Sequence, residues 1–252
     1  MHMTPAILLA TNHCLAVAKP ARMPVTDEDS GDLSLVEWAR DWIRVEHGKP
    51  GNVFLEAAHR IDRPVSGVVL FARTSKAASR LTAAFRMRDV EKTYLAVVRG
   101  TPSKPSATLV DWLVKDRESN ISRVVPAGTR DARECTLTYS LVARGKRRDG
   151  LDVTLLKIEP LTGRPHQIRV QLAFAGMPIV GDVKYGGPRL VTGTGEQGEK
   201  SWIALHSSRL VFPNPTAQHE ALVAEAPLPD AWPSEFGSAL FGASHESSAP
   251  RE

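Results

Sequence analysis

The chain has 252 residues, of which 42% are hydrophobic and 24% are charged. This length suits one large domain or two lobes that share a sheet, and this composition excludes a mainly disordered chain. The formal net charge of +4 favours a nucleic-acid partner only weakly, because many metabolic enzymes carry a similar excess. Cys14 and Cys135 are too far apart in sequence for a metal-ligand motif, so we expect two buried, reduced thiols.

The N-terminal segment does not have the pattern of a secretion signal. Its apolar run, residues 6–10, is short, and no Lys or Arg precedes it. No run in the sequence approaches the ~20 apolar residues that a membrane-spanning helix needs. We therefore expect a cytoplasmic protein without a membrane partner.

The first part of the chain predicts a hairpin, two helices and a buried strand. The sequence Ser34-Leu35-Val36-Glu37 is a capping box, and apolar residues follow it at helical spacing until Gly48. The predicted elements are a hairpin of residues 7–9 and 14–18, a loop over 19–31, the capped helix from 35, a strand at 68–72 and a helix over 75–88.

Strands dominate the second part of the chain. They are predicted over residues 90–99, 107–115, 121–126, 134–143, 151–161 and 202–212. The charged turn 144–150 between two of them is expected to be a solvated hairpin tip. Thr162-Gly163-Arg164-Pro165 marks a helix start, with Pro165 at the first helical position, and Gly176 and Pro178 end that helix. Residues 193–200 are predicted to form a polar loop.

These elements predict an α+β fold, because strands outnumber helices and often follow one another directly. We expect a largely antiparallel mixed sheet flanked by helices. No internal repeat or clear linker divides the sequence, so residues 1–236 are expected to form a single domain. Residues 237–252, rich in Ser, Ala, Pro and Glu, are expected to be a frayed tail.

The densest polar cluster runs from His59 to Gly67, directly before an apolar strand. Asp62 stands between Arg60 and Arg63, and the positive potential of two arginines keeps a carboxylate ionised. An ionised carboxylate can act as a nucleophile or stabilise a cationic sugar. A salt-bridged loop with a turn at Ser66-Gly67 explains the same residues without catalysis, and this segment alone favours that explanation.

A second polar cluster lies at the predicted helix start near Pro165. Arg164, His166, Gln167 and Arg169 gather there, where free backbone N–H groups favour anions. Pro165 and Arg169 are four residues apart, so Arg169 is expected to project from the first turn of the helix. A capped helix with exposed basic groups is the simpler interpretation.

Together the two clusters resemble RluA-type RNA pseudouridine synthases. The segment 59–67 is similar to that family's histidine-arginine-leucine-aspartate-arginine signature, and Gly163-Arg164-Pro165-His166-Gln167-Ile168-Arg169 is similar to its third motif. Further matches in the same order are Lys19-Pro20, Lys92-Thr93-Tyr94, Gly181-Asp182 with Tyr185-Gly186, and Leu205-His206. The resemblance covers about residues 10–232. It departs at Ile61, where leucine is commoner, and at Pro64-Val65, and no S4-type RNA-binding domain precedes it.

This resemblance implies a pseudouridine synthase fold with an active-site cleft across the sheet. It also implies isomerisation of specific uridines in ribosomal or transfer RNA without a cofactor, by a monomer that binds an RNA stem-loop. Asp62 is then the essential carboxylate, and Arg169 is its preferred ion-pair partner ahead of Arg164. Whether Asp62 attacks the sugar or the base, or promotes a glycal, is left open.

Other residues receive expected roles from the same resemblance. Tyr94 stacks on the uracil or removes the C5 proton, whereas the sequence alone favours an ordinary core tyrosine. Arg60 fills the gap left by the extruded base. Lys19, Arg164 and Ile168 are expected to contact the RNA substrate, the first two through phosphates.

Two other classes of function fit parts of the sequence. A metal-dependent hydrolase would use His59, Asp62, His166 and His206, although their spacing matches no recognised metal motif, so no metal is expected. A non-catalytic RNA-binding or RNA-folding factor on the same fold would leave RNA-linked function intact without Asp62.

Overall fold

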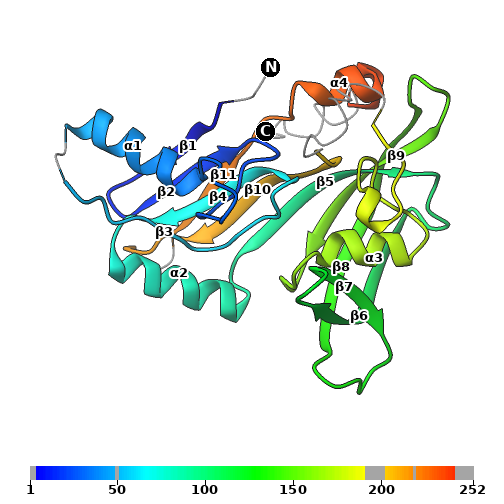
Figure 1. Cartoon of the computed structure of the whole chain (residues 1–252), viewed down its shortest axis with the longest axis horizontal. Coiled ribbons are helices and arrows are strands. Elements are labelled where there is room, and N and C mark those ends of the chain that lie inside the picture. Colours follow the sequence, from blue (N-terminus) through cyan, green and yellow to red (C-terminus); the bar gives the residue numbers. More distant parts are fainter. Residues whose placement is uncertain (1–3, 49–50, 191–201, 218–219, 242–252) are drawn as a thin grey trace, which may run out of the picture. The chain divides into compact units, whose positions relative to one another are not determined.

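The computed structural model describes residues 4–48, 51–190, 202–217 and 220–241 (Figure 1). The chain forms two compact units. Unit 1 comprises Met1–Thr93 and His206–Leu228, and unit 2 comprises Tyr94–Leu205 and Pro229–Glu252. The predicted single domain over residues 1–236 stays a prediction.

Unit 1 is a mixed sheet with two helices. Its strands are β1 (Ala6–Ala10), β2 (Cys14–Lys19), β3 (Glu56–Ala57), β4 (Ser66–Ala72), β10 (Leu205–Pro213) and β11 (Ala221–Glu225), and its helices are α1 (Leu35–His47) and α2 (Ser75–Met87). The strand order is β1-β2-β4-β10, with β3 beside β4 and β11 beside β10. Strands β4 and β10 run parallel, and the other described pairings within this unit are antiparallel.

Local sequence sets the ends of both helices. The Ser34 side chain accepts a hydrogen bond from the backbone N–H of Glu37, which completes the predicted capping box of α1. Gly48 ends that helix in the left-handed conformation, as predicted. The Thr74 side chain caps the start of α2 by accepting a hydrogen bond from the backbone N–H of Ala77. The predicted hairpin of β1 and β2 is also confirmed.

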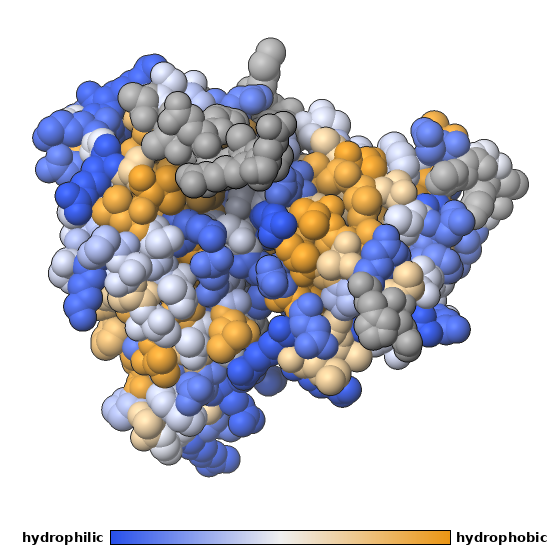
Figure 2. Space-filling model, turned by 180° about the vertical axis from the view of Figure 1, so that it is seen from behind, coloured by the Kyte–Doolittle hydropathy of each residue, from blue (hydrophilic) through white to orange (hydrophobic). Residues whose placement is uncertain are grey.

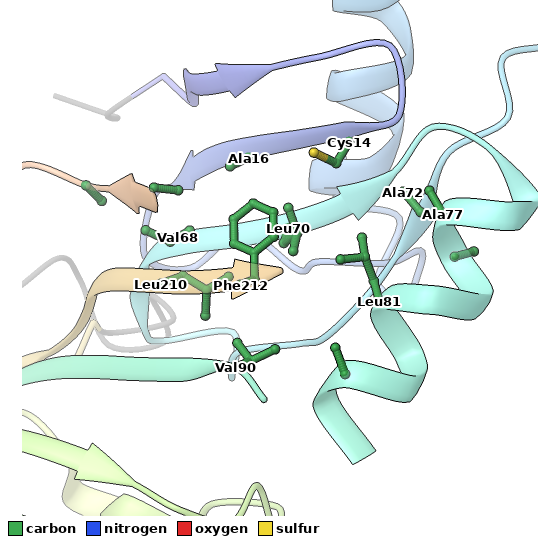
Figure 3. Packing of buried hydrophobic residues seen from close by; sticks show 14 of the residues in the cluster. Cys14, Ala16, Val68, Leu70, Ala72, Ala77, Leu81, Val90, Leu210 and Phe212 are labelled. Atoms are coloured by element: carbon green, nitrogen blue, oxygen red, sulfur yellow. The ribbon is translucent and has the colours of Figure 1, made fainter. Parts of the chain in front are cut away.

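The main core of unit 1 lies between its sheet and α2 (Figure 3). Alternate residues of β2 and β4 point into it, because successive side chains on a strand face opposite sides. The buried members include Cys14, Ala16, Val68, Leu70, Leu81, Leu210 and Phe212. The intervening residues of β2 and β4 point to the opposite side of the sheet and are buried as well. Helix α1 lies on that opposite side (Figure 1).

Gly67 permits a close approach between the parallel strands. It pairs with Ser207 and has a φ of +115°. A Cβ atom at Gly67 would lie 2.1 Å from the backbone oxygen of Ser207, so no other residue fits without moving β4 or β10. Ser66-Gly67 therefore belongs to a strand, and the turn that the salt-bridge interpretation placed there is wrong.

Unit 2 is an antiparallel sheet with short helices. Its strands are β5 (Glu91–Arg99, entering from unit 1), β6 (Ser106–Asp116), β7 (Ile121–Val125), β8 (Arg133–Lys146) and β9 (Asp152–Pro160), in the order β5-β9-β8-β6-β7. The helical elements are α3 (Gln167–Phe174), η1 (Val183–Tyr185), α4 (Ala231–Phe236) and η2 (Ser238–Leu240). The described pairings between its strands are antiparallel. The α+β prediction with a largely antiparallel sheet is confirmed.

Four predictions about local structure need correction. Helix α3 begins at Gln167 after His166 in the left-handed conformation, so Pro165 is not its first residue. Arg147 in the charged turn is buried instead of solvated, and it pairs with Asp149 and with Glu235 of α4. The predicted last strand begins at Leu205, and β11 and α4 were not predicted.

The tail predicted to fray is folded in its described part. Residues 238–240 form η2, and the side chains of Leu240 and Phe241 are buried. Phe241 packs beside Trp232 and Phe236 of α4, with ring centroids 6.0 and 6.5 Å away. The loop predicted over residues 193–200 and the rest of the tail lie outside the described residues.

No helix in the described part of the chain is long and apolar enough to span a membrane. Hydrophilic residues cover most of the face in Figure 2, and apolar residues gather there in separate patches. This distribution is ordinary for a folded protein surface.

Candidate functional site

Asp62 lies in a tight turn that buried neighbours hold in place. The backbone N–H of Val65 donates to the Asp62 carbonyl at 2.9 Å, and Arg63 and Pro64 form the corner of the turn. Ile61 and Val65 on either side are buried, whereas Asp62 itself is half-buried. The turn leads directly into β4, so the Asp62 backbone is anchored to the sheet of unit 1.

The buried Lys19 side chain, at the end of β2, holds this turn in place through hydrogen bonds. Its side chain is 1% exposed, and Nζ donates to the carbonyl oxygens of Pro20, Met23 and Arg63 at 3.0, 2.8 and 3.1 Å. These contacts take up all three donors of an ammonium group. Lys19 therefore supports the Asp62 turn from within the protein, and its predicted phosphate contact stays a prediction.

Lys19 also supplies positive charge near Asp62. Burial lowers the pKa of Lys19 to about 7, and the Asp62 carboxylate opposes this shift by favouring the charged ammonium. Arg63 has another set of partners, because its guanidinium binds Glu28 at 3.0 Å and also Asp32. Lys19 is thus a positive neighbour of Asp62 within unit 1, which the sequence did not suggest. Arg60 is exposed, as its expected RNA contact requires.

His59 and His206 have structural roles in unit 1. The backbone N–H of Leu70 donates to Nε2 of His59 at 3.1 Å, and the His59 ring stacks on Phe85. Nδ1 of His206 lies 2.9 Å from the Ser66 hydroxyl. Burial lowers the pKa of both rings to about 4, which keeps them neutral near neutral pH.

The residues proposed for the metal-dependent hydrolase do not gather as ligands. Among the residues that the structure describes, no three His, Cys, Asp or Glu side chains form a group suited to a metal ion. The contacts of His59 and His206 instead tie these two rings to neighbouring residues of unit 1.

Tyr94 lies on β5, on the strand face predicted from the alternating sequence. It pairs with Ile158 of β9 and is 9% exposed. Ala96 and Val98, which share its face, are buried. The rigid strand fixes the direction of the Tyr94 ring, which suits a stacking platform as well as a core residue.

Arg169 projects from the first turn of α3 into a buried ion pair. Its Nε and one terminal nitrogen donate to the two oxygens of Asp182 at 2.7 and 2.9 Å, and both side chains are almost completely buried. Asp182 was expected only as part of a motif, and its contact with Arg169 was not predicted.

Tyr185 lies against the same guanidinium. The Arg169 Cζ atom is 5.0 Å from the centre of the Tyr185 ring, which is within the range of a cation–π contact. The Tyr185 hydroxyl lies 2.7 Å from Nδ1 of His166 and accepts a hydrogen bond from the backbone N–H of Ser122 at 2.9 Å. These contacts join η1, the start of α3 and β7 into one cluster within unit 2.

Gln167 connects the segment before α3 with β8. Its Oε1 accepts from the backbone N–H of Arg164 at 3.0 Å, and its Nε2 donates to the Thr136 carbonyl at 3.0 Å. Arg164 is exposed and donates through Nε to the Glu134 carbonyl. Ile168 is buried on α3. The structure thus brings Arg164, Ile168 and Arg169 together at one helix start.

Solved structures share this fold. The human RNA Pseudouridylate Synthase Domain Containing 4 matches with a TM-score of 0.72 and 24% identity, covering 90% of each chain. The human RNA Pseudouridylate Synthase Domain Containing 1 matches with a TM-score of 0.70 and 23% identity, covering 90% of this chain and 84% of the other. The fold is therefore that of the pseudouridine synthase class.

Sequence comparison identifies the family. The sequence model of RNA pseudouridylate synthases matches residues 13–174, and the chain belongs to this family. The matched range contains Asp62, Tyr94 and Arg169.

Curated relatives agree with this assignment. The tRNA pseudouridine synthase C of Vibrio cholerae is 32% identical over 240 residues, covering 92% of this chain and 95% of the relative. The ribosomal large subunit pseudouridine synthase C of Vibrio parahaemolyticus is 30% identical over 210 residues, covering 83% of this chain. This chain spans only 62% of the length of that ribosomal enzyme.

Proposed function

We propose that the protein isomerises specific uridines to pseudouridine in ribosomal or transfer RNA, with Asp62 as the essential carboxylate. The observation that carries this proposal is the Asp62 turn. A half-buried carboxylate lies within the matched family range, on a backbone that Lys19 and two buried flanking residues hold rigid. Such preorganisation is what a catalytic group requires.

The reaction breaks the N-glycosidic bond, turns the uracil and joins its C5 atom to the sugar. Asp62 serves this sequence as nucleophile or as the stabiliser of a cationic sugar. Arg169 is the proposed ion-pair partner of Asp62, in addition to its own pairing with Asp182. Tyr94 stacks on the uracil and receives or relays the proton that leaves C5. N1 of the uracil takes up a proton as C5 loses one, so substrate and product are isomers and no cofactor is required.

Substrate contacts are assigned to the exposed basic residues. Arg60 fills the space of the extruded uridine, because a base inside folded RNA is otherwise unreachable. Arg164 binds an RNA phosphate, and Ile168 contributes apolar contact to the bound nucleotide. The partner is a ribosomal or transfer RNA stem-loop, and the enzyme acts as a monomer in the cytoplasm.

The test compares Asp62→Asn with Asp89→Asn, which changes an exposed carboxylate of the same unit. The substrate is total RNA tritiated at uridine C5, taken from cells that lack the gene. Wild type and Asp89→Asn should release tritium, whereas Asp62→Asn should lose release and keep its affinity for the RNA. Mapping of pseudouridine in the same RNA identifies the modified position.

Two results would contradict the proposal in different ways. Undiminished tritium release by Asp62→Asn would remove Asp62 from the chemistry. An RNA-linked growth phenotype that Asp62→Asn fully restores, together with no pseudouridine that depends on the gene, would favour a non-catalytic RNA-folding factor.

A further inference from the structure

Arg169 occupies a position that a lone cation would avoid. It is the third residue of α3, where the positive end of the helix dipole opposes a guanidinium. Its side chain is 5% exposed, so water does not compensate for the charge. A buried partner is therefore needed to stabilise the charge of Arg169 and to fix its direction.

Asp182 provides this stabilisation from a separate segment. Its two oxygens bind Nε and one terminal nitrogen of Arg169 side by side, and this bidentate geometry fixes the plane of the guanidinium. The backbone of Asp182 is itself anchored, because its N–H donates to the Ile179 carbonyl at 3.1 Å. Its carbonyl accepts from Tyr185 and Gly187 at 3.0 and 2.9 Å.

The ring of Tyr185 lies against the same guanidinium, with the Arg169 Cζ atom over the ring at 5.0 Å from its centre. The ring is held through its hydroxyl by His166 and Ser122, which belong to the start of α3 and to β7. The Ser122 hydroxyl also donates to the Pro165 carbonyl at 2.8 Å. Arg169 is thus held by the two oxygens of a carboxylate and by contact with an anchored ring.

We propose that Asp182 and Tyr185 are positioning residues that orient Arg169 for the isomerisation of uridine. This inference rests on the proposed function, because it assigns a role only through Arg169. Asp182 and Tyr185 act only through Arg169 and do not touch the reacting atoms. Asp182 sets the plane and charge balance of the guanidinium, and Tyr185 restricts its movement through the ring contact.

Unit 2 offers a matched control for the loss of a buried ion pair. Arg147 binds Glu235 at 3.3 Å, and the Glu235 side chain is 0% exposed. Glu235→Gln removes a buried carboxylate from an arginine, as Asp182→Asn does, but away from Arg169. Both variants should lower the melting temperature, so stability alone does not separate them.

The turnover number separates positioning from a purely structural role. At a temperature where all variants are folded, Asp182→Asn should lower kcat about 100-fold, a typical cost of misplacing a catalytic group by about 1 Å. KM for the tritiated RNA should stay within about 2-fold, and Glu235→Gln should leave both constants within about 2-fold of wild type. Tyr185→Leu should lower kcat more than Tyr185→Phe, which keeps the ring.

A double-mutant cycle shows whether Asp182 acts through Arg169. Arg169→Lys keeps the charge but loses the planar fork, so Asp182→Asn added to it should cost less than about 3-fold in kcat. A full 100-fold loss in that background, or an Asp182→Asn variant as active as wild type, would overturn the inference. Absence of tritium release from wild type would instead overturn the proposed function itself, and this inference with it.

Discussion

The ammonium nitrogen of Lys19 lies 3.1 Å from the carbonyl oxygen of Arg63, the residue that follows Asp62. This contact joins the end of β2 to the turn that carries the proposed catalytic carboxylate. The same nitrogen also binds the carbonyl oxygens of Pro20 and Met23. A single buried cation therefore organises two loops of unit 1.

Lys19→Met should destabilise the protein by about 3 kcal/mol, because three buried carbonyl oxygens lose their donor. Urea denaturation followed by circular dichroism measures this loss. Lys76→Met, an exposed change on α2, should alter the free energy of unfolding by less than about 0.5 kcal/mol. Equal effects of the two substitutions would show that the Lys19 contacts add little stability.

The stability difference between wild type and Lys19→Met should depend on pH. Burial lowers the pKa of Lys19 from 10.5 to about 7. Between these values the unfolded chain binds more protons at this position than the folded chain, so this group's contribution to stability rises with pH. The wild type should therefore gain stability relative to Lys19→Met as the pH increases above about 7. A difference that is constant from neutral to alkaline pH would contradict this expectation.

Gly67→Ala should destabilise unit 1 by more than about 3 kcal/mol, because the new methyl group meets the Ser207 backbone and the positive φ is strained. Gly163→Ala is the matched control, since a Cβ atom there meets nothing within 4 Å. Thermal unfolding of both variants gives the comparison. If Gly67→Ala and Gly163→Ala had the same melting temperature, β4 and β10 would have to pair less closely than described.

Tyr94→Phe should keep RNA binding and slow tritium release about 100-fold or more, the usual contribution of a positioned proton acceptor. Tyr139→Phe changes another buried tyrosine of unit 2, whose hydroxyl donates to the Lys104 carbonyl at 3.4 Å, and should leave release unchanged. Normal release by Tyr94→Phe would restrict Tyr94 to stacking on the uracil.

The sequence predicted those elements whose signals are local. The capping box at Ser34 placed the start of α1, and alternation along residues 90–99 predicted the strand β5 that carries Tyr94. Periodicity and caps depend on neighbours in the chain, so they can be recognised without any tertiary contact. The fold class followed from the succession of strands.

Other features depend on distant partners and could not be predicted in this way. Pro165 suggested a helix start, but His166 adopts the left-handed conformation and α3 begins only at Gln167, whose side chain accepts from the Arg164 N–H. Arg147 looked like a solvated charge because its buried partner, Glu235, follows much later in the chain. Asp182 was visible in its motif, yet only the structure pairs it with Arg169.

The parallel pairing of β4 with β10 has a consequence for synthesis of the chain. Ser66 and His206, which meet across that pairing, are 140 positions apart, and all strands of unit 2 lie between them. During translation β4 therefore emerges long before the strand that completes its edge, and Leu210 and Phe212 are missing from its core. We expect the nascent N-terminal portion to need protection from aggregation, and shortened chains that stop before β10 to fail to fold.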